Sequence, residues 1–169
     1  MMKPLLVVMG VSGCGKSTLG RALAQALGIP FVEGDDLHPP ANVAKMASGQ
    51  PLNDTDRIPF LDNVAASLAR HAEQGCVVSC SALKRAYRDR IAASVGRPVR
   101  FILPLLSKER LVERMTARKD HFMPVILLES QLATLEVPAP EEQAIIVEGA
   151  DDLDRQLACV IAHLSAEND

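Results

Sequence analysis

The stretch Gly10-Val11-Ser12-Gly13-Cys14-Gly15-Lys16-Ser17-Thr18 decides the fold of this chain. It has the pattern G-x-x-x-x-G-K-[ST], follows the apolar run at 5–9 and precedes an alanine- and leucine-rich helical pattern at 19–27. A strand, a glycine-rich turn and a helix in this order are the context of a phosphate-binding loop. We therefore predict that residues 10–18 bind a nucleoside triphosphate.

The residue types in this loop suit phosphate groups. Glycines allow the backbone to coil tightly, so that successive N–H groups face the phosphate oxygens, and the start of the following helix adds a positive potential. Lys16 supplies a mobile charge for the β and γ oxygens, and the Ser17 hydroxyl can ligate Mg²⁺. Cys14 is expected to point away from the phosphates and to pack in the core.

Length and composition predict one globular domain. The chain has 169 residues, of which 48% are hydrophobic and 23% charged, and we treat 1–169 as a single domain. A net charge of −3 without a basic tract argues against a nucleic acid partner. No apolar run is long enough to span a bilayer, and a cleaved signal peptide would remove the phosphate loop. We therefore expect a cytoplasmic protein without a membrane partner.

Short apolar runs alternate with helical patterns along the whole chain, which favours a parallel sheet covered by helices. Strands are expected at 5–9, 30–33, 76–80, 99–105 and 145–147. Helices are expected at 15–27, 39–48, 59–74, 86–94, 107–118, 124–135 and 152–164, with a polar loop at 51–57. Five strands with helices on both faces predict a three-layer, doubly wound α/β fold, whose ligands bind beyond the carboxyl ends of the strands.

Two polar segments follow predicted strands and should therefore lie beside the phosphate loop. In the first, at 33–36, Asp35 could accept a proton from an attacking hydroxyl or orient it, and Glu33 could contact Mg²⁺ through water. Asp36 fits a solvated turn equally well. In the second, at 81–84, Lys84 is expected to face the cleft.

The segment at about 38–74 is predicted to form a helical region that binds the phosphate acceptor. Arg57 carries a planar fork that suits a carboxylate, if the acceptor is an acid. His38 could form hydrogen bonds with acceptor hydroxyls, or could equally serve a structural role at the start of a helix. The basic segment at about 114–126 suits a mobile lid that excludes water from the phosphates, although an exposed basic helix end is the alternative.

Several longer blocks resemble the bacterial gluconokinases, in order and over nearly the whole chain. The blocks are Glu33-Gly34-Asp35-Asp36-Leu37-His38-Pro39, the run from Lys45-Met46-Ala47-Ser48-Gly49 to Asp56-Arg57, Ser81-Ala82-Leu83-Lys84-Arg85-Ala86-Tyr87-Arg88-Asp89, the run 117–124 and Leu128-Glu129-Ser130-Gln131. This resemblance implies a nucleoside-monophosphate-kinase-like fold and ATP-dependent phosphorylation of D-gluconate at its 6-hydroxyl. It also implies Mg²⁺ as the metal and a homodimer as the common assembly.

The resemblance also implies roles for individual residues. Asp35 would contact the acceptor hydroxyl, and Arg57 and Lys84 would help to bind the sugar acid. Arg114 and Arg118 match the lid arginines of the family, which pack on adenine and contact phosphate respectively. With Lys16, this makes Asp35 and Arg118 the predicted catalytic residues.

Two positions depart from the family pattern, and two other readings remain. The family usually has Asp at the position of Glu33, which bears on the metal geometry, and Trp at the position of Phe60, which bears on acceptor packing.

A shikimate kinase would share the architecture and would also need arginines for a carboxylate. A nucleotide-switch GTPase or a regulatory module would share only the phosphate loop, and the chain has no N-K-x-D guanine-reading segment.

Overall fold

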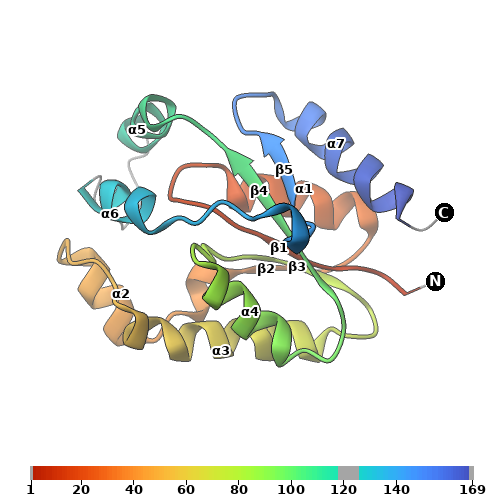
Figure 1. Ribbon diagram of the computed structural model, residues 1–169, viewed down its shortest axis with the longest axis horizontal. Helices are drawn as coiled ribbons and strands as arrows, with labels where there is room; N and C mark the ends of the chain where they lie inside the picture. Colours follow the sequence, from red (N-terminus) through yellow and green to blue (C-terminus); the bar gives the residue numbers. More distant parts are fainter. Residues whose placement is uncertain (1, 118–125, 168–169) are drawn as a thin grey trace.

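The computed structural model of the chain describes residues 2–117 and 126–167 (Figure 1). Its centre is a parallel sheet of five strands in the order β2-β3-β1-β4-β5. The strands are β1 (Leu5–Val8), β2 (Phe31–Glu33), β3 (Cys76–Ser79), β4 (Val99–Leu105) and β5 (Ile145–Glu148). The predicted three-layer α/β fold with five parallel strands is confirmed.

The side chains of β1 alternate between two cores, one on each face of the sheet. Leu6 and Val8 pack in the core under α1 (Lys16–Leu27) and α7 (Leu153–Ala166). Leu5 and Val7 pack in the opposite core, under α3 (Asp54–Arg70) and α4 (Arg85–Ala93). Because both faces are covered, the strand is apolar at every position, which is typical of a parallel sheet.

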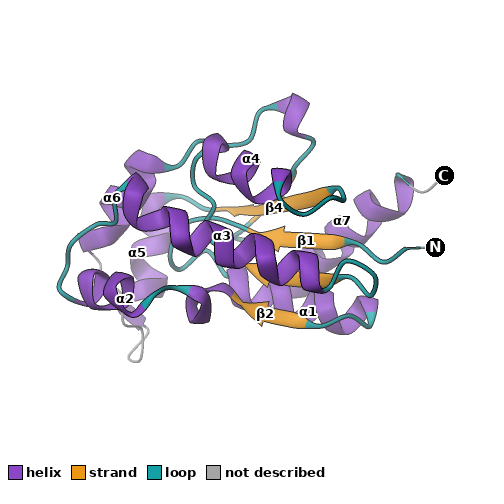
Figure 2. Cartoon of the chain, turned by 90° about the horizontal axis from the view of Figure 1, so that it is seen from below, coloured by secondary structure: helices purple, strands orange, loops and turns teal. Residues whose placement is uncertain are grey.

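The remaining helices gather beyond the carboxyl ends of the strands, and the ends of the described chain lie at the opposite side (Figure 2). These helices are α2 (Pro40–Ala47), α5 (Lys108–Ala117) and α6 (Ile126–Thr134). A 3₁₀ turn, η1 (Gly34–Leu37), joins β2 to α2, and a second one, η2 (Pro140–Glu142), precedes β5. The carboxyl edge of the sheet is therefore the edge where a ligand can be enclosed.

The predicted start of α3 is wrong. We expected a polar loop at 51–57 and a helix from Pro59, but the helix begins at Asp54 and contains Pro59. The reason is a capping box: Asn53 Oδ1 accepts from the Asp56 N–H at 2.8 Å, and Asp56 Oδ2 accepts from the Asn53 N–H at 3.0 Å. The turn that carries Arg57 is therefore helical, and its orientation is fixed by the cap.

No helix in the described ranges, 2–117 and 126–167, is long and apolar enough to cross a membrane. Burial raises the pKa of the Cys76 thiol to about 11 and that of the Cys80 thiol to about 12. Both thiols lie in the core under α3 and α4, as expected for small apolar side chains.

Candidate active site

The phosphate loop connects β1 to α1 and has a core-facing side and a pocket-facing side. Val11 and Cys14 are buried beneath the loop, where Cys14 Sγ lies 3.8 Å from the Met9 carbonyl oxygen. Gly10 has φ of +130°, and a Cβ atom there would lie 2.7 Å from Cys14 Sγ. Cys14 therefore packs away from the phosphate side, as predicted, and Gly10 leaves it room.

On its other side, the loop turns Lys16 and Ser17 toward the pocket. Lys16 Nζ donates to the Val11 carbonyl oxygen at 3.0 Å, so the side chain folds back over the loop. Ser17 Oγ donates to Glu33 Oε1 at 2.9 Å, and Ser79 Oγ donates to the same oxygen at 2.6 Å. Three oxygen-bearing side chains from α1, β2 and β3 thus meet directly beside the phosphate loop.

Asp35 lies in η1, immediately after β2, and lines the same pocket as Lys16. The approach of η1 to β3 requires Gly34, because a Cβ atom there would lie 1.6 Å from the Ser79 carbonyl oxygen. The Gly34 N–H also donates to Ser79 Oγ at 2.9 Å. Gly34 therefore fixes the place from which Asp35 reaches the pocket.

His38 follows η1 and its ring stacks on Phe60 of α3, with ring centroids 3.6 Å apart and planes inclined by 12°. Burial, together with the nearby Arg57 charge, lowers the pKa of His38 from 6.5 to about 4. The ring is therefore neutral at pH 7. Its Nδ1 lies 3.4 Å from the amide nitrogen of Asn42, a donor, so the ring proton is placed on Nε2.

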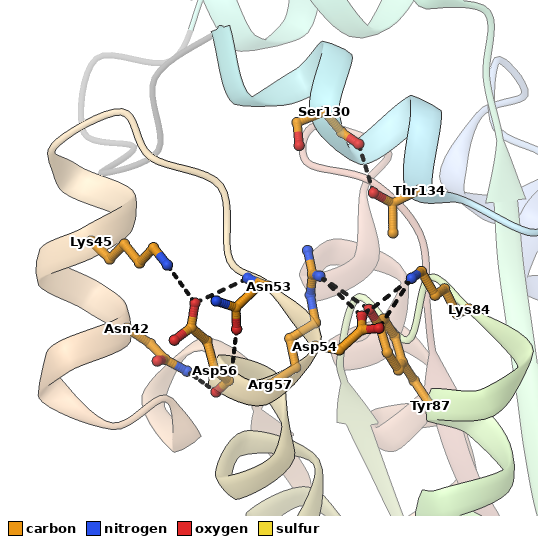
Figure 3. A network of polar contacts seen from close by, with 10 residues as sticks. All are labelled: Asn42, Lys45, Asn53, Asp54, Asp56, Arg57, Lys84, Tyr87, Ser130 and Thr134. Atoms are coloured by element: carbon orange, nitrogen blue, oxygen red, sulfur yellow. Dashed lines mark hydrogen bonds and ion pairs between the residues drawn. The ribbon is translucent and has the colours of Figure 1, made fainter.

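Arg57 and Lys84 belong to one polar network, drawn in Figure 3. Arg57 Nη1 donates to Tyr87 Oη at 3.0 Å, and Lys84 Nζ donates to the two Asp54 carboxylate oxygens at 3.2 and 3.4 Å. Tyr87 Oη in turn donates to Asp54 Oδ1. The hydrogen bond to Asp54 is the main cause that raises the pKa of Lys84, so its ammonium group stays charged.

One pocket brings most of the predicted site residues together. Its lining includes residues of the phosphate loop (Ser12, Gly13, Gly15, Lys16, Ser17), Asp35, His38 and Arg57. Glu33 lies behind Ser17, and Lys84 lies beside the pocket without lining it. Thr18 is exposed on the first turn of α1. The phosphate loop and the acceptor-binding candidates therefore face one another across a single space.

Arg114 of α5 lies beside the phosphate loop. Its guanidinium donates to the Gly13 carbonyl oxygen at 3.5 Å and to the Gly149 carbonyl oxygen at 3.0 Å. Arg114 thus connects the phosphate loop to the segment after β5. Arg118 and most of the predicted lid at 114–126 lie outside the described residues.

Sequence reasoning assigned no role to Gln131, although it forms part of the pocket. Its Oε1 accepts from the Ser12 N–H at 2.7 Å, across 119 residues of sequence. Ser130 and Leu127 of the same helix also line the pocket, as does Ser81 after β3. The block 128–131 belongs to the family resemblance, but only the tertiary contact of α6 with the phosphate loop indicates what it touches.

Comparisons with known proteins agree with this geometry. The family described as AAA domain matches residues 5–138. A gluconokinase from Gluconobacter oxydans (strain 621H) is 48% identical over 170 residues, which cover 99% of this chain and 95% of that protein. The crystal structure of a gluconokinase from Sinorhizobium meliloti 1021 has a TM-score of 0.88 at 45% identity, and the match covers 98% of this chain and 93% of that chain.

A shikimate kinase from Aquifex aeolicus vf5 has a TM-score of 0.65 at 15% identity, over 96% of this chain and 97% of that one. At this identity the likeness shows the fold alone. The pocket suits phosphoryl transfer, because the phosphate-binding loop with Lys16 and the acidic residue Asp35 line the same space. The cluster of Ser17, Glu33 and Ser79 lies beside that loop.

Proposed function

This chain belongs to the gluconokinase family, and from that premise we propose that it transfers the γ-phosphoryl group of ATP to the 6-hydroxyl of D-gluconate. The product would be 6-phosphogluconate, with ADP released. The observation that carries the proposal is the shared pocket, in which the phosphate loop faces Asp35, His38 and Arg57. A shikimate kinase is not favoured, because the similarity to that class is confined to the fold.

On the nucleotide side, Lys16 would exchange its contact with the Val11 carbonyl oxygen for the β and γ oxygens of ATP. The loop N–H groups and the amino end of α1 would hold the remaining phosphate charge. Arg114, beside Gly13 and Gly149, would pack against the adenine ring. Arg118, which the sequence assigns to a phosphate contact, stays part of the proposal, together with the lid.

The cluster of Ser17, Glu33 and Ser79 fits a magnesium ion. Mg²⁺ prefers oxygen ligands, and in kinases it takes one or two from the protein and the rest from phosphates and water. Ser17 Oγ and Glu33 Oε1 lie 2.9 Å apart and are the residues that would hold it. When bound, the ion neutralises charge on the transferred phosphoryl group. Glu33 and the Asp that is usual in the family both supply a carboxylate here. The longer side chain of Glu33 therefore still offers an oxygen ligand for Mg²⁺.

On the acceptor side, each polar group matches a part of gluconate. Asp35 would accept a hydrogen bond from the attacking hydroxyl and orient it toward the γ-phosphate. The neutral His38, with its proton on Nε2, would donate to another hydroxyl. Arg57 would bind the carboxylate through its fork, and Lys84 would add positive charge from the side.

Three further properties belong to the proposal. The acceptor-binding helical region is taken as about 38–74 within a single domain. A homodimer and a cytoplasmic location are proposed on the family resemblance. None of the three is needed for the chemistry described above.

A coupled assay of ADP release tests the proposed function. We would supply Mg-ATP with D-gluconate, shikimate, glucose, AMP or no acceptor. We expect turnover with gluconate and background rates with the other additions. Turnover with shikimate or AMP in place of gluconate would refute the substrate assignment. ATP binding without turnover of any of these acceptors would refute the proposal that the protein phosphorylates one of them.

A further inference from the structure

We propose that Tyr87 and Asp54 are positioning residues that hold Arg57 and Lys84 in place for the acceptor carboxylate. The inference rests on the proposed function and deepens it, because it names residues that set the specificity for an acid. Neither Tyr87 nor Asp54 lines the pocket. Both would act through the two cations that they contact (Figure 3).

Tyr87, Asp54, Arg57 and Lys84 form one hydrogen-bonded unit. The direction of each hydrogen bond in it follows from the chemistry of these side chains. A guanidinium can only donate, and an ionised carboxylate can only accept. The hydrogen bonds from Tyr87 and then from Lys84 lower the pKa of Asp54, so its carboxylate is ionised at neutral pH. The Tyr87 proton must therefore point to Asp54, which leaves a lone pair of Tyr87 Oη to accept from Arg57.

This arrangement fixes the position of Arg57 and leaves most of its N–H donors available. Tyr87 accepts one of the five N–H donors of a guanidinium, so a carboxylate can still be bound by the others. The Arg57 side chain is 12% exposed and lines the pocket, and its central carbon lies 5.3 Å from the centre of the Tyr87 ring. Ring and hydroxyl together hold the fork in one orientation, which a flexible side chain alone would not keep.

The same two residues also explain how two cations can lie near one aromatic ring. Lys84 Nζ lies 5.6 Å from the centre of the Tyr87 ring, on which Arg57 also lies. Asp54 supplies the compensating charge, at 3.2 Å from Lys84 and 4.0 Å from Arg57. Asp54 and Arg57 share one face of α3 because they are three residues apart in its first two turns.

The first turn of α3 is itself anchored from two sides. The Asn53–Asp56 capping box fixes its backbone, and Lys45 Nζ of α2 donates to Asp56 Oδ2 at 2.6 Å. Asn42 Nδ2, also on α2, donates to the Asp56 carbonyl oxygen at 2.8 Å. Tyr87 is 6% exposed on α4, which packs against α3. The unit is therefore built on helical elements and assembled before the acceptor binds.

The test is a set of steady-state measurements on Tyr87→Phe and Asp54→Asn. Tyr87→Phe keeps the ring and deletes only the hydroxyl. We expect its KM for gluconate to rise about tenfold, while kcat and the KM for ATP stay within about twofold. Asp54→Asn should change KM in the same direction. Asp62→Asn is the matched control, because it removes an exposed carboxylate of α3 that pairs with Arg90 of α4, and it should leave all three constants unchanged.

A mutant cycle separates positioning from direct contact. If Tyr87 acts through the two cations, adding Tyr87→Phe to a variant with both Arg57→Ala and Lys84→Ala should produce no further rise in the KM for gluconate. Independent, multiplying effects would overturn the inference, as would an unchanged KM in Tyr87→Phe and Asp54→Asn while the wild-type protein phosphorylates gluconate. Should Tyr87→Phe not fold, Asp54→Asn alone tests the inference. The Asp54 side chain is 67% exposed, so its replacement should not disturb folding.

The failure of this inference differs from the failure of the proposed function. If the wild-type protein phosphorylates a different acid, gluconate is the wrong substrate, and the same variants are measured with that acid. If the wild-type protein phosphorylates no acid, both proposals are overturned.

Discussion

Asp35 is the residue that we propose orients the acceptor hydroxyl for phosphoryl transfer. It lies in η1 and lines the same pocket as the phosphate loop, a position that suits the proposed role. We expect Asp35→Asn to lower kcat by about 10²-fold or more, with little change in the KM for ATP. Asp36→Asn, which alters the exposed neighbouring carboxylate, should leave kcat within about twofold. Equal losses in both variants, measured by ADP release, would contradict the role of Asp35.

His38 gives a prediction about pH. Its pKa is lowered to about 4, so between pH 6.5 and about 4 the unfolded chain binds a proton there and the folded protein does not. Stability therefore rises with pH across this window, and the contribution of His38 is lost as the pH falls through it. An NMR titration of the His38 imidazole should have its midpoint near pH 4. A midpoint near 6.5 would show that the ring is solvated and not stacked against Phe60.

Some site residues could be predicted from the sequence because their positions depend on local patterns. Lys16 and Ser17 follow from the loop motif, and Asp35 follows from its place after a strand. Tyr87 and Gln131 carry no such local signal. Tyr87 reaches Arg57 across 30 residues and Gln131 reaches Ser12 across 119, so their contacts depend on how helices pack. The position of Lys84 beside the pocket depends in the same way on Asp54.

At the scale of elements, α4 is attached to the segment before β5 by the buried side chain of Arg88. Arg88 is 2% exposed, and its guanidinium forms an ion pair with Glu142 at 2.7 Å. It also donates to the carbonyl oxygens of Ala82 and Leu83, in the loop after β3, and to that of Glu136. One side chain thus holds together α4, the loop after β3 and the segment that contains Glu136 and Glu142.

We expect Arg88→Met to lower the free energy of unfolding by about 3–5 kcal/mol, because it leaves Glu142 and several carbonyl groups without their donor. Arg90→Met is the matched control on the same helix. Its ion pair with Asp62 is exposed, so the loss should be at most about 1 kcal/mol. Urea unfolding of both variants measures the difference, and similar losses would show that Arg88 is not a buried anchor.

The elements themselves were largely predictable, with one instructive exception. Hydrophobic runs and glycine signals located all five strands and most helices, because these signals are local. The start of α3 is the exception: proline suits the first residue of a helix, so Pro59 predicts a start there that the structure does not have. The Asn53–Asp56 capping box begins the helix five residues earlier, and proline is accommodated within it. A cap with reciprocal hydrogen bonds is therefore the better signal here.

At the scale of the whole molecule, the parallel sheet determines where the chemistry takes place. The order β2-β3-β1-β4-β5 places β1 in the middle, so the phosphate loop lies between η1 on one side and the segment after β5 on the other. The alternation of strands and helices predicts a parallel sheet, but strand order depends on crossovers that no local pattern encodes. The proposed acceptor side and the proposed nucleotide-base side of the pocket depend on that order.

The most direct test of the central claim is ³¹P NMR of the protein with Mg-ATP and D-gluconate, recorded with proton coupling. We predict ADP and one phosphate monoester whose signal is a triplet, because the phosphorus couples to the two C6 methylene protons of 6-phosphogluconate. Protein with Lys16→Ala should form the ester far more slowly. A doublet would place the phosphate on a secondary hydroxyl, and inorganic phosphate without an ester would mean that water, not gluconate, is the acceptor.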